Sequence, residues 1–468
     1  MKYISESELL YDIMMNKRKN SFNRREFMEK GAKLSIAPFA LPLIKMNYDP
    51  VSLSNKQKLA MVGTGSRGKE MWGRSLIESY PDRLEFVGLC DANLKRAEIV
   101  RKQIGINIPV YHSQEFSKMI TEQKPDTVIV TTTDCFHAKY TKQALELGCN
   151  VISEKPLVTD EQQAQEILNA ENKSGKKIIT TFNARFGVSS EEIKKVISSG
   201  ELGKIISVEF QEYLDIDHGA SYFRRWHGKK KYSGSLLVHK ASHHFDQINW
   251  WVGDDPDTVF AFGDVSFYGK NKTFRHRNCR ACPFASKCDF YWDITKEKDL
   301  MDLYVSCEKE DGYLRDGCVW DNEIDTYDTM TVEAKYKSGI LLSYSLNAFM
   351  PYEGQRIAFN CEKGRLDIRN YQRQPWEVNH TAEFRLTENF KKTRTWTVQR
   401  GEGGHGGSDE KLKDLIFIHG KPDPQGQLAN SRAGVMSSLI GIAARKSIET
   451  GQSIKIDDLV KFPLTWGW

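Results

Sequence analysis

The sequence has almost no excess of charge of either sign, and its apolar runs are short. Its 468 residues carry a formal net charge of +5, and residues 1–50 alone hold nine Lys or Arg against six Asp or Glu. The remainder is nearly neutral, which argues against the concentrated basic face of a nucleic-acid-binding protein. The apolar run at 34–44 has about half of the roughly 20 residues that a membrane-spanning helix needs, so no integral membrane segment is expected.

The N-terminal segment has the pattern of an export signal. Asn23-Arg24-Arg25-Glu26-Phe27-Met28 is a twin-arginine sequence, and the short apolar run LSIAPFALPLI follows it. A paired-arginine region followed by such a run is typical of a cleaved signal. We therefore predict a leader at 1–55 and a periplasmic protein. The alternative is an ordinary amphipathic helix on a cytoplasmic protein.

The chain after the leader is long enough for two domains. Its first part alternates short apolar segments with helical segments of ten to sixteen residues. Solidly apolar strands separated by helices predict a parallel sheet covered on both faces. The strands are expected at 58–62, 84–90, 126–132, 149–153 and 177–182.

A glycine-rich turn follows the first predicted strand. Gly63, Gly65 and Gly68 form a G-x-G-x-x-G pattern that opens a helix, and Asp91 ends the next strand. This is the context that a dinucleotide-binding motif requires, with free backbone N–H groups at the helix start for the pyrophosphate and an acid for the ribose. The acid favours NAD over NADP, although Arg96 lies close enough to modify that preference. The predicted cofactor-binding residues in this region are Gly63, Gly65, Ser66, Arg67, Gly68, Asp91 and Arg96.

Further motifs make the chain resemble the Gfo/Idh/MocA oxidoreductases. They are Thr132-Thr133-Asp134-Cys135-Phe136-His137, Glu154-Lys155-Pro156, Asn183-Ala184-Arg185-Phe186, and the stretch from Tyr232 to His243 and Asp246. The resemblance implies an NAD-binding Rossmann domain at 56–182. It also implies an α/β domain at 183–468 with an open, mostly antiparallel sheet, whose free face pairs subunits into a homodimer or homotetramer. It adds Thr132, His137, Glu154 and Lys155 to the cofactor site.

Hydride transfer from an alcohol needs a base for the hydroxyl proton and a cation beside the developing alkoxide. The Glu-Lys-Pro motif assigns Lys155 to the second role. His243 is the predicted acid/base, because the unperturbed pKa of histidine lies near working pH. His239 stands where the family usually has an aspartate, so it is interpreted as a second substrate contact, an alternative base or a metal ligand. Asp246, three residues after His243, is expected to orient it.

The predicted substrate is a carbohydrate. Aromatic rings beside arginines suit a sugar, whose apolar face stacks on rings and whose hydroxyls need hydrogen-bond donors; a structured loop edge suits them equally. His405 lies in the glycine-rich segment GEGGHGGSD, which either approaches the substrate or is a plain turn. The predicted substrate-binding residues are Arg185, Arg225, Trp226, His239, Asp246 and His405.

A cysteine-rich insert at about 268–320 interrupts the second domain. Cys279 and Cys282 have the C-x2-C spacing of a metal knuckle, and Cys288 and Cys307 are interpreted as completing a tetrahedral zinc site, with an iron–sulfur cluster as the second choice. Disulfides are the rival interpretation for an exported chain. In either case the insert is expected to cross-link a loop of the second domain.

Three functions are compatible with these patterns. The first is an NAD-dependent sugar or glycoside dehydrogenase, with oxidation at C3 as one form. The second is a glycosidase that uses bound NAD in an oxidation–elimination–reduction cycle. The third is a catalytically dead NAD-sensing protein, which the absence of an aspartate at position 239 leaves open.

Overall fold

The structure is a computed structural model that describes residues 56–376 and 381–462. The leader at 1–55, and with it the export prediction, lies outside the described residues. Within the described ranges, no helix combines the length and the apolarity that a membrane crossing requires.

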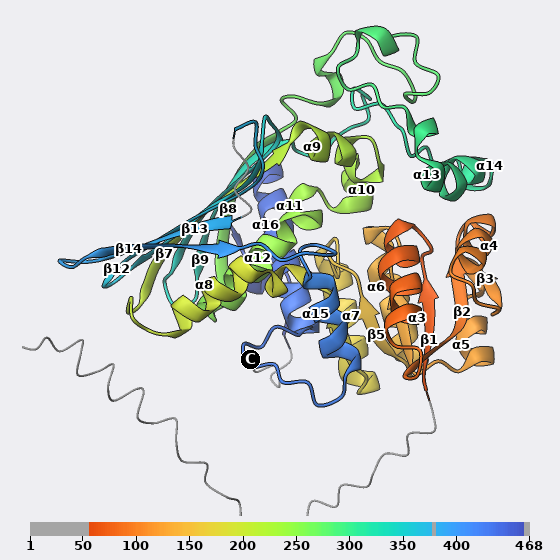
Figure 1. The fold of residues 1–468 in the computed structure, drawn as a ribbon, viewed down its shortest axis with the longest axis horizontal. Coiled ribbons are helices and arrows are strands. Elements are labelled where there is room, and N and C mark those ends of the chain that lie inside the picture. The colour runs from red at the N-terminus through yellow and green to blue at the C-terminus, as the bar shows by residue number, and fades with distance from the viewer. Residues whose placement is uncertain (1–55, 377–380, 463–468) are drawn as a thin grey trace, which may run out of the picture. The chain divides into compact units, whose positions relative to one another are not determined.

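A seven-stranded sheet forms the core of the first domain (Figure 1). Its strand order is β15-β6-β5-β4-β1-β2-β3, and every pair is parallel except β15 with β6. The strand order reverses at β1, and ligand crevices form at such a switch point, outside the carboxyl ends of the strands. The strands are β1 (Gln57–Val62), β2 (Leu84–Asp91), β3 (Val110–His112), β4 (Thr127–Val130), β5 (Asn150–Ser153), β6 (Ile178–Thr180) and β15 (Ala429–Asn430).

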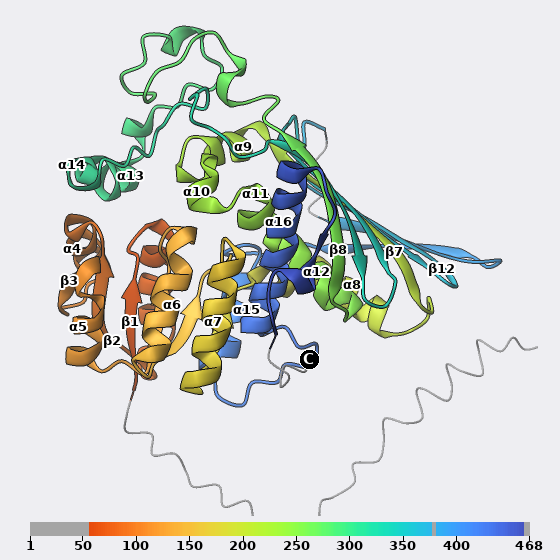
Figure 2. The same ribbon diagram turned by 180° about the vertical axis from the view of Figure 1, so that it is seen from behind.

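Helices connect these strands and lie along the sheet (Figures 1 and 2). Their ends follow local sequence. In the longest connection the Asp160 side chain accepts a hydrogen bond from the backbone N–H of Gln163, and Gly175 ends the helix with a φ of 68°, as is usual for an N-cap and a left-handed C-cap. The helices are α3 (Ser75–Ser79), α4 (Leu94–Gln103), α5 (Phe116–Gln123), α6 (His137–Glu146) and α7 (Glu161–Ser174).

The second domain is built on a nine-stranded sheet of order β14-β13-β12-β11-β7-β10-β9-β8-β16. Only the pair of β7 and β10 is parallel. In β9 and β10 buried and exposed residues alternate, as expected when one face packs on helices and the other is open. The strands are β7 (Ile205–Asp215), β8 (Pro256–Asp264), β9 (Thr329–Tyr336), β10 (Leu341–Met350), β11 (Glu353–Cys361), β12 (Gly364–Arg373), β13 (Thr381–Glu388), β14 (Thr393–Gln399) and β16 (Ile454–Lys455).

Helices cover the packed face of this sheet. The long helix α16 packs against β8, α11 and α12, and it also contacts β6 and β15 of the first sheet. The two sheets together confirm the predicted fold class of a Rossmann domain followed by an α/β domain with a mostly antiparallel sheet. The helices are α8 (Val188–Ser198), α9 (Ile216–Phe223), α10 (Lys230–Ser233), α11 (Leu236–His239), α12 (Ala241–Val252), α15 (Ser408–Phe417) and α16 (Ser431–Thr450).

The cysteine-rich insert connects β8 to β9. It is made of turns and short helices, among them α13 (Lys298–Leu303) and α14 (Glu308–Asp311). Figures 1 and 2 both show it extending from the second domain until α13 and α14 lie over the Rossmann domain beside α4, and α13 contacts α4. The insert therefore reaches the crevice that the glycine-rich turn lines.

Candidate active site

The glycine-rich turn lies between β1 and the helical segment that starts at Gly68. Gly63 has a φ of +95°, and a Cβ built on it would lie 2.6 Å from the backbone of Thr131. A Cβ on Gly68 would lie 2.4 Å from the carbonyl oxygen of Gly63. These positions accept only glycine, because a side chain would force the turn away from the neighbouring strand. The turn thus has the close packing that a dinucleotide-binding turn requires.

Asp91 ends β2 at the edge of this turn. One carboxylate oxygen accepts hydrogen bonds from the backbone N–H and the hydroxyl of Thr64 at 2.6 and 2.8 Å. The other accepts the backbone N–H of Asn93 at 2.8 Å and lies 3.5 Å from the Arg96 guanidinium. The carboxylate therefore holds the turn in place and also lines the cleft. Arg96 forms an ion pair with it, so its charge is partly neutralised.

A buried acid and an arginine connect the turn to the glycine-rich segment near the C-terminus. Arg67 Nε lies 2.8 Å from Glu154 Oε1, and Arg67 Nη1 lies 2.9 Å from Asp409 Oδ2. Burial raises the pKa of Glu154, but Arg67 and the Trp72 indole outweigh it, so the pKa of this carboxyl lies below its usual range. Asp409 also holds His405 Nδ1 at 2.8 Å, although the His405 side chain is 64% exposed.

Lys155 and Asp134 meet His239 at the carboxyl ends of β4 and β5. Lys155 Nζ donates to the backbone carbonyl of His239 at 2.9 Å. His239 Nδ1 lies 2.6 Å from Asp134 Oδ2. Burial lowers the pKa of Lys155 to about 8, although Asp134 opposes this effect. Burial also raises the pKa of Asp134 and lowers that of His239, and the short contact holds one proton between the two side chains.

His243 lies four residues after His239, in the first turn of α12, and lines the same cleft. Its Nδ1 atom is buried and has no hydrogen-bond partner among the described residues. Burial first and Lys155 second hold its pKa well below the usual range, so the ring is neutral at physiological pH and able to accept a proton. The neighbouring His244 is 2% exposed, and its Nδ1 lies 2.9 Å from the hydroxyl of the buried Tyr344.

His137 supports the site from behind. It is 1% exposed, and its two ring nitrogens lie 2.7 Å from the carbonyl oxygen of Pro156 and 3.0 Å from that of Thr132. It thereby ties the loop after β4 to the Glu-Lys-Pro segment after β5. The side chain positions Thr132 and the Glu-Lys-Pro segment and also lines the cleft, so its contact with the cofactor stays a prediction.

Arg185 and Asp246 differ from their predicted roles. They form a buried bidentate ion pair, with Nη2–Oδ1 and Nε–Oδ2 distances of 2.6 and 2.7 Å, and neither lines the cleft. Asp246 lies on α12, on the face that packs against the Asn183–Phe186 turn rather than beside His243. The predicted substrate contacts and the predicted orientation of His243 by Asp246 are therefore wrong.

The second domain supplies an aromatic and charged wall. Arg225 and Trp226, the predicted substrate contacts, both line the cleft. Trp226 stacks on His227 with a centroid distance of 3.5 Å, and its ring is edge-on to His239 at 5.6 Å. His405 lines the rim of the same cleft. The wall continues onto α9 and the sheet, where the cleft is lined by His218 and Tyr222 of α9, Glu212 of β7, and Glu353 and Gln355 of β11.

The cysteine insert is not organised as predicted. Cys279, Cys282, Cys288 and Cys318 surround one small apolar cavity, whereas Cys307 is buried beside the Rossmann domain, where its carbonyl accepts a hydrogen bond from Asn93 at 3.0 Å. Cys307 therefore cannot complete the predicted set. The nine cysteines are free thiols, and no three His, Cys, Asp or Glu side chains in the described ranges gather closely enough to hold an ion. The predicted zinc or iron–sulfur site has no support.

Two of the residues that complete the site were not predicted. Asp134 was part of a recognised motif without an assigned role, and Tyr304 comes from the insert. The cleft that Asp134, Lys155, His239, His243 and Tyr304 line measures about 2190 Å³. Pockets for a single small ligand measure roughly 300–1,000 Å³, so this cleft has room for a dinucleotide together with a second ligand. These features define a two-domain nucleotide-binding protein whose cleft brings together a lysine and two histidines.

Comparison with known proteins agrees with this class. The family model of the Gfo/Idh/MocA oxidoreductases matches with its NAD-binding Rossmann fold at 57–182 and with its C-terminal alpha/beta domain at 194–456. The chain is 34% identical to the putative oxidoreductase YteT of Bacillus subtilis, over 86% of this chain and 98% of that protein. It is 34% identical to D-glucoside 3-dehydrogenase of Escherichia coli, over 32% of this chain and 42% of that protein.

A solved structure shows the same fold. The WlbA dehydrogenase of Bordetella pertussis, in complex with NADH and UDP-GlcNAcA, has a TM-score of 0.59 at 17% identity and covers 86% of this chain and 99% of that one. The chain belongs to the Gfo/Idh/MocA family of NAD-binding oxidoreductases. The tight turn at Gly63–Gly68 and the acid at the end of β2 fit that cofactor.

Proposed function

We propose that this protein is an NAD-dependent dehydrogenase that oxidises a hydroxyl carbon of a sugar or glycoside. The observation that carries the proposal is the convergence of Lys155, His239 and His243 on one cleft beside the NAD-binding turn. The aromatic and polar wall suits a carbohydrate, because rings pack on its apolar face while polar side chains bind its hydroxyls. The similarity to a glucoside dehydrogenase supports the same substrate class.

Each residue has a defined task in this proposal. When bound, NAD⁺ supplies the acceptor for the hydride. Lys155, as the ammonium, stabilises negative charge on the substrate oxygen. His243 accepts the hydroxyl proton, because its ring is neutral at physiological pH. His239, fixed through Nδ1 by Asp134, presents its other ring nitrogen to a neighbouring hydroxyl. Burial of this group excludes water and strengthens these interactions.

The test uses the purified full chain, first denatured to identify any nucleotide that it releases, and then supplied with NAD⁺ and a panel of sugars and glycosides. We expect NADH to accumulate with at least one of them. Lys155→Met is expected to bind NAD⁺ normally and to lose turnover by about 100-fold or more. Lys142→Met, which removes a surface lysine paired with Glu166, is the matched control.

Other outcomes would reject the proposal. A Lys155→Met protein with the turnover of wild type would remove this residue from the reaction. Cleavage of a glycoside without net formation of NADH would identify the internal oxidation–elimination–reduction cycle instead. Binding of NAD⁺ and sugar without any turnover would identify a sensing protein.

A further inference from the structure

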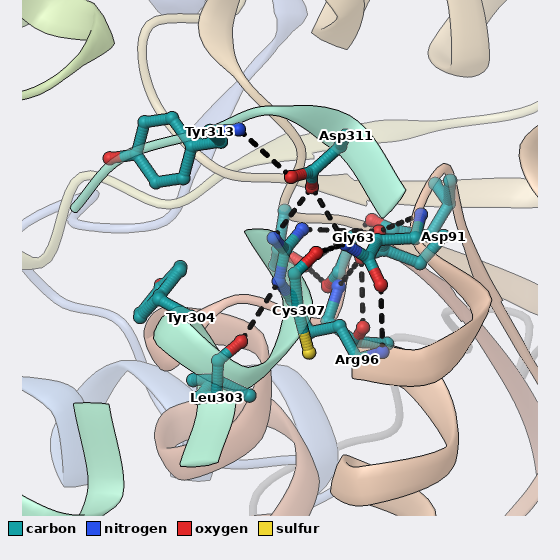
Figure 3. Close-up of polar contacts among 12 residues, drawn as sticks. Gly63, Asp91, Arg96, Leu303, Tyr304, Cys307, Asp311 and Tyr313 are labelled. Atoms are coloured by element: carbon teal, nitrogen blue, oxygen red, sulfur yellow. Dashed lines mark hydrogen bonds and ion pairs between the residues drawn. The ribbon is translucent and has the colours of Figure 1, made fainter. Parts of the chain in front are cut away.

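The tip of the insert, residues 297–315, lies directly on the cofactor-binding turn (Figure 3). The Tyr304 hydroxyl accepts a hydrogen bond from the backbone N–H of Ser66 at 2.9 Å and lies 3.0 Å from the Ser66 hydroxyl. A Cβ on Gly65 would lie only 3.2 Å from the same hydroxyl. In a dinucleotide-binding turn the backbone N–H groups serve the diphosphate. The phenol oxygen of Tyr304 therefore lies at the diphosphate site, where the hydroxyl accepts from Ser66 and has its own proton to donate to a phosphate oxygen.

The ring of Tyr304 is held between two arginines. The guanidinium carbon of Arg96 lies 5.3 Å from the ring centroid, and that of Arg315 lies 5.5 Å from it. Arg96 has its own carboxylates, Asp91 and Asp311. Arg315 has no carboxylate partner. Within the described part of the chain it forms no ion pair, and it lies over the Tyr304 ring.

A second arginine that forms no ion pair with a carboxylate of the described residues lies close by. Arg225 donates from Nε to the carbonyl of Ser221 at 2.6 Å and otherwise lies over the Tyr222 ring. Burial and the neighbouring Arg315 lower the pKa of Arg225 to about 10. Two adjacent guanidinium groups on the wall of a cleft repel each other unless an anion lies between them. Both arginines line the cleft, together with Tyr304.

Polar contacts fasten the tip of the insert to the Rossmann domain. Asp311 accepts from Arg96 at 2.7 Å and from Asn93 at 2.9 Å. The carbonyl of Leu303 accepts from Arg96 Nε at 3.2 Å, as Figure 3 shows. The carbonyl of Ser306 accepts from Lys95 at 2.5 Å. The tip thus closes over the adenosine side of the turn with several partners on α4 and the loop before it.

We infer that the tip of the insert is part of the cofactor site, with Tyr304 and Arg315 binding the diphosphate of the dinucleotide and the Asp311 contacts slowing its release. The inference rests on NAD binding, which the family assignment establishes, and it deepens the proposed function by making the insert a cofactor clasp. A protein with such a clasp keeps its nucleotide for many turnovers. The anion between Arg225 and Arg315 is then the diphosphate rather than a carboxylate on the sugar.

The test measures binding and release of nucleotide on the full chain, without any sugar. The probes are NAD⁺, ADP-ribose and adenosine, the last of which lacks the diphosphate. Arg315→Gln is expected to weaken NAD⁺ and ADP-ribose by about tenfold or more, because a charge-assisted contact is lost. Adenosine affinity is expected to change by less than about twofold. Arg315→Lys is expected to recover part of the loss. Tyr304→Phe is expected to speed release of NAD⁺ several-fold.

Two control variants remove the same kinds of group, a positive charge and a phenol hydroxyl, at positions that do not contact the cofactor-binding turn. Lys309→Gln removes an exposed positive charge from α14, and Tyr291→Phe removes an exposed phenol elsewhere on the insert. Both are expected to bind and release NAD⁺ like wild type.

Three results would overturn the inference. The first is wild-type affinity and release in both Arg315→Gln and Tyr304→Phe. The second is an equal loss for adenosine and ADP-ribose, which would mean that the tip only shapes the adenosine pocket. The third is normal nucleotide binding by Arg315→Gln together with a weakened affinity for an acidic sugar in a separate titration, which would assign Arg315 to the substrate. None of these depends on whether a sugar is oxidised, so failure of the proposed dehydrogenase activity remains a separate result.

Discussion

His239 Nδ1 lies 2.6 Å from Asp134 Oδ2, and this contact joins the helix α11 of the second domain to the loop after β4 of the Rossmann domain. Asp134 is 2% exposed and His239 is 8% exposed. The chain thus builds the pair across its two domains, with Lys155 donating to the backbone of the same histidine. A carboxyl that orients an imidazole is a recurring device in proton transfer, because it fixes the ring and its tautomer.

Asp134→Asn is expected to lower kcat about 100-fold while leaving NAD⁺ affinity close to that of wild type. The amide retains the size of the carboxyl, but it holds the His239 ring less firmly and no longer opposes the lowering of the Lys155 pKa by burial. Steady-state kinetics and NAD⁺ titration measure the two quantities. Asp457→Asn, at an exposed ion pair with Lys337, is the control. Because Asp134 also raises the pKa of Lys155, the fall in activity with rising pH must begin at a lower pH in this variant; a lower kcat with an unchanged profile would indicate a purely structural role.

The reaction is expected to slow as pH rises above about 8. The pKa of Lys155 is lowered to about 8 by burial, so its stabilising charge is present below that pH and is lost above it. His243 stays neutral throughout this range, since its pKa is held well below the usual value. The measurement is kcat/KM for the sugar between pH 6 and 10.

Lys155→Arg provides the matched comparison. The guanidinium remains charged over this whole range, so any residual activity is expected to lose the fall above pH 8. A fall that persists unchanged in this variant would assign the titration to another group.

The Rossmann part of the fold was predictable because its signals are local. Gly63 and Gly68 follow an apolar strand, and the strand that ends at Asp91 comes next, so one short stretch carries the whole pattern. The strand β15 was not predictable. It has only two residues, and it forms because Ala429 and Asn430 pair with β6 far away in the sequence.

The candidate site was predictable only where a motif identified it. Lys155 and His243 came from family motifs and line the cleft. Tyr304 carries no motif, and it reaches Ser66 across 238 residues. Cysteine spacing likewise could not show whether Cys307 or Cys318 lies beside Cys279, Cys282 and Cys288. The insert folds back so that Asn278 bridges Gly317, and this pairing places Cys318 beside the cavity that Cys279 lines. Such contacts depend on the tertiary fold, which a linear pattern does not contain.

The ion pair of Arg185 and Asp246 is expected to stabilise the fold without touching the substrate. Asp246→Asn leaves the Arg185 guanidinium buried without its charge partner, and breaking a buried pair in this way costs about 3–5 kcal/mol. Its side chains are 5% and 1% exposed, so little water is available to compensate. Denaturant unfolding measures the loss. The natural comparison is Glu201→Gln, which breaks the more exposed pair with Arg394 and is expected to cost less than about 1 kcal/mol. The folded fraction of Asp246→Asn should keep the wild-type KM for the sugar; a KM that rises with little loss of stability would return Asp246 to the substrate site.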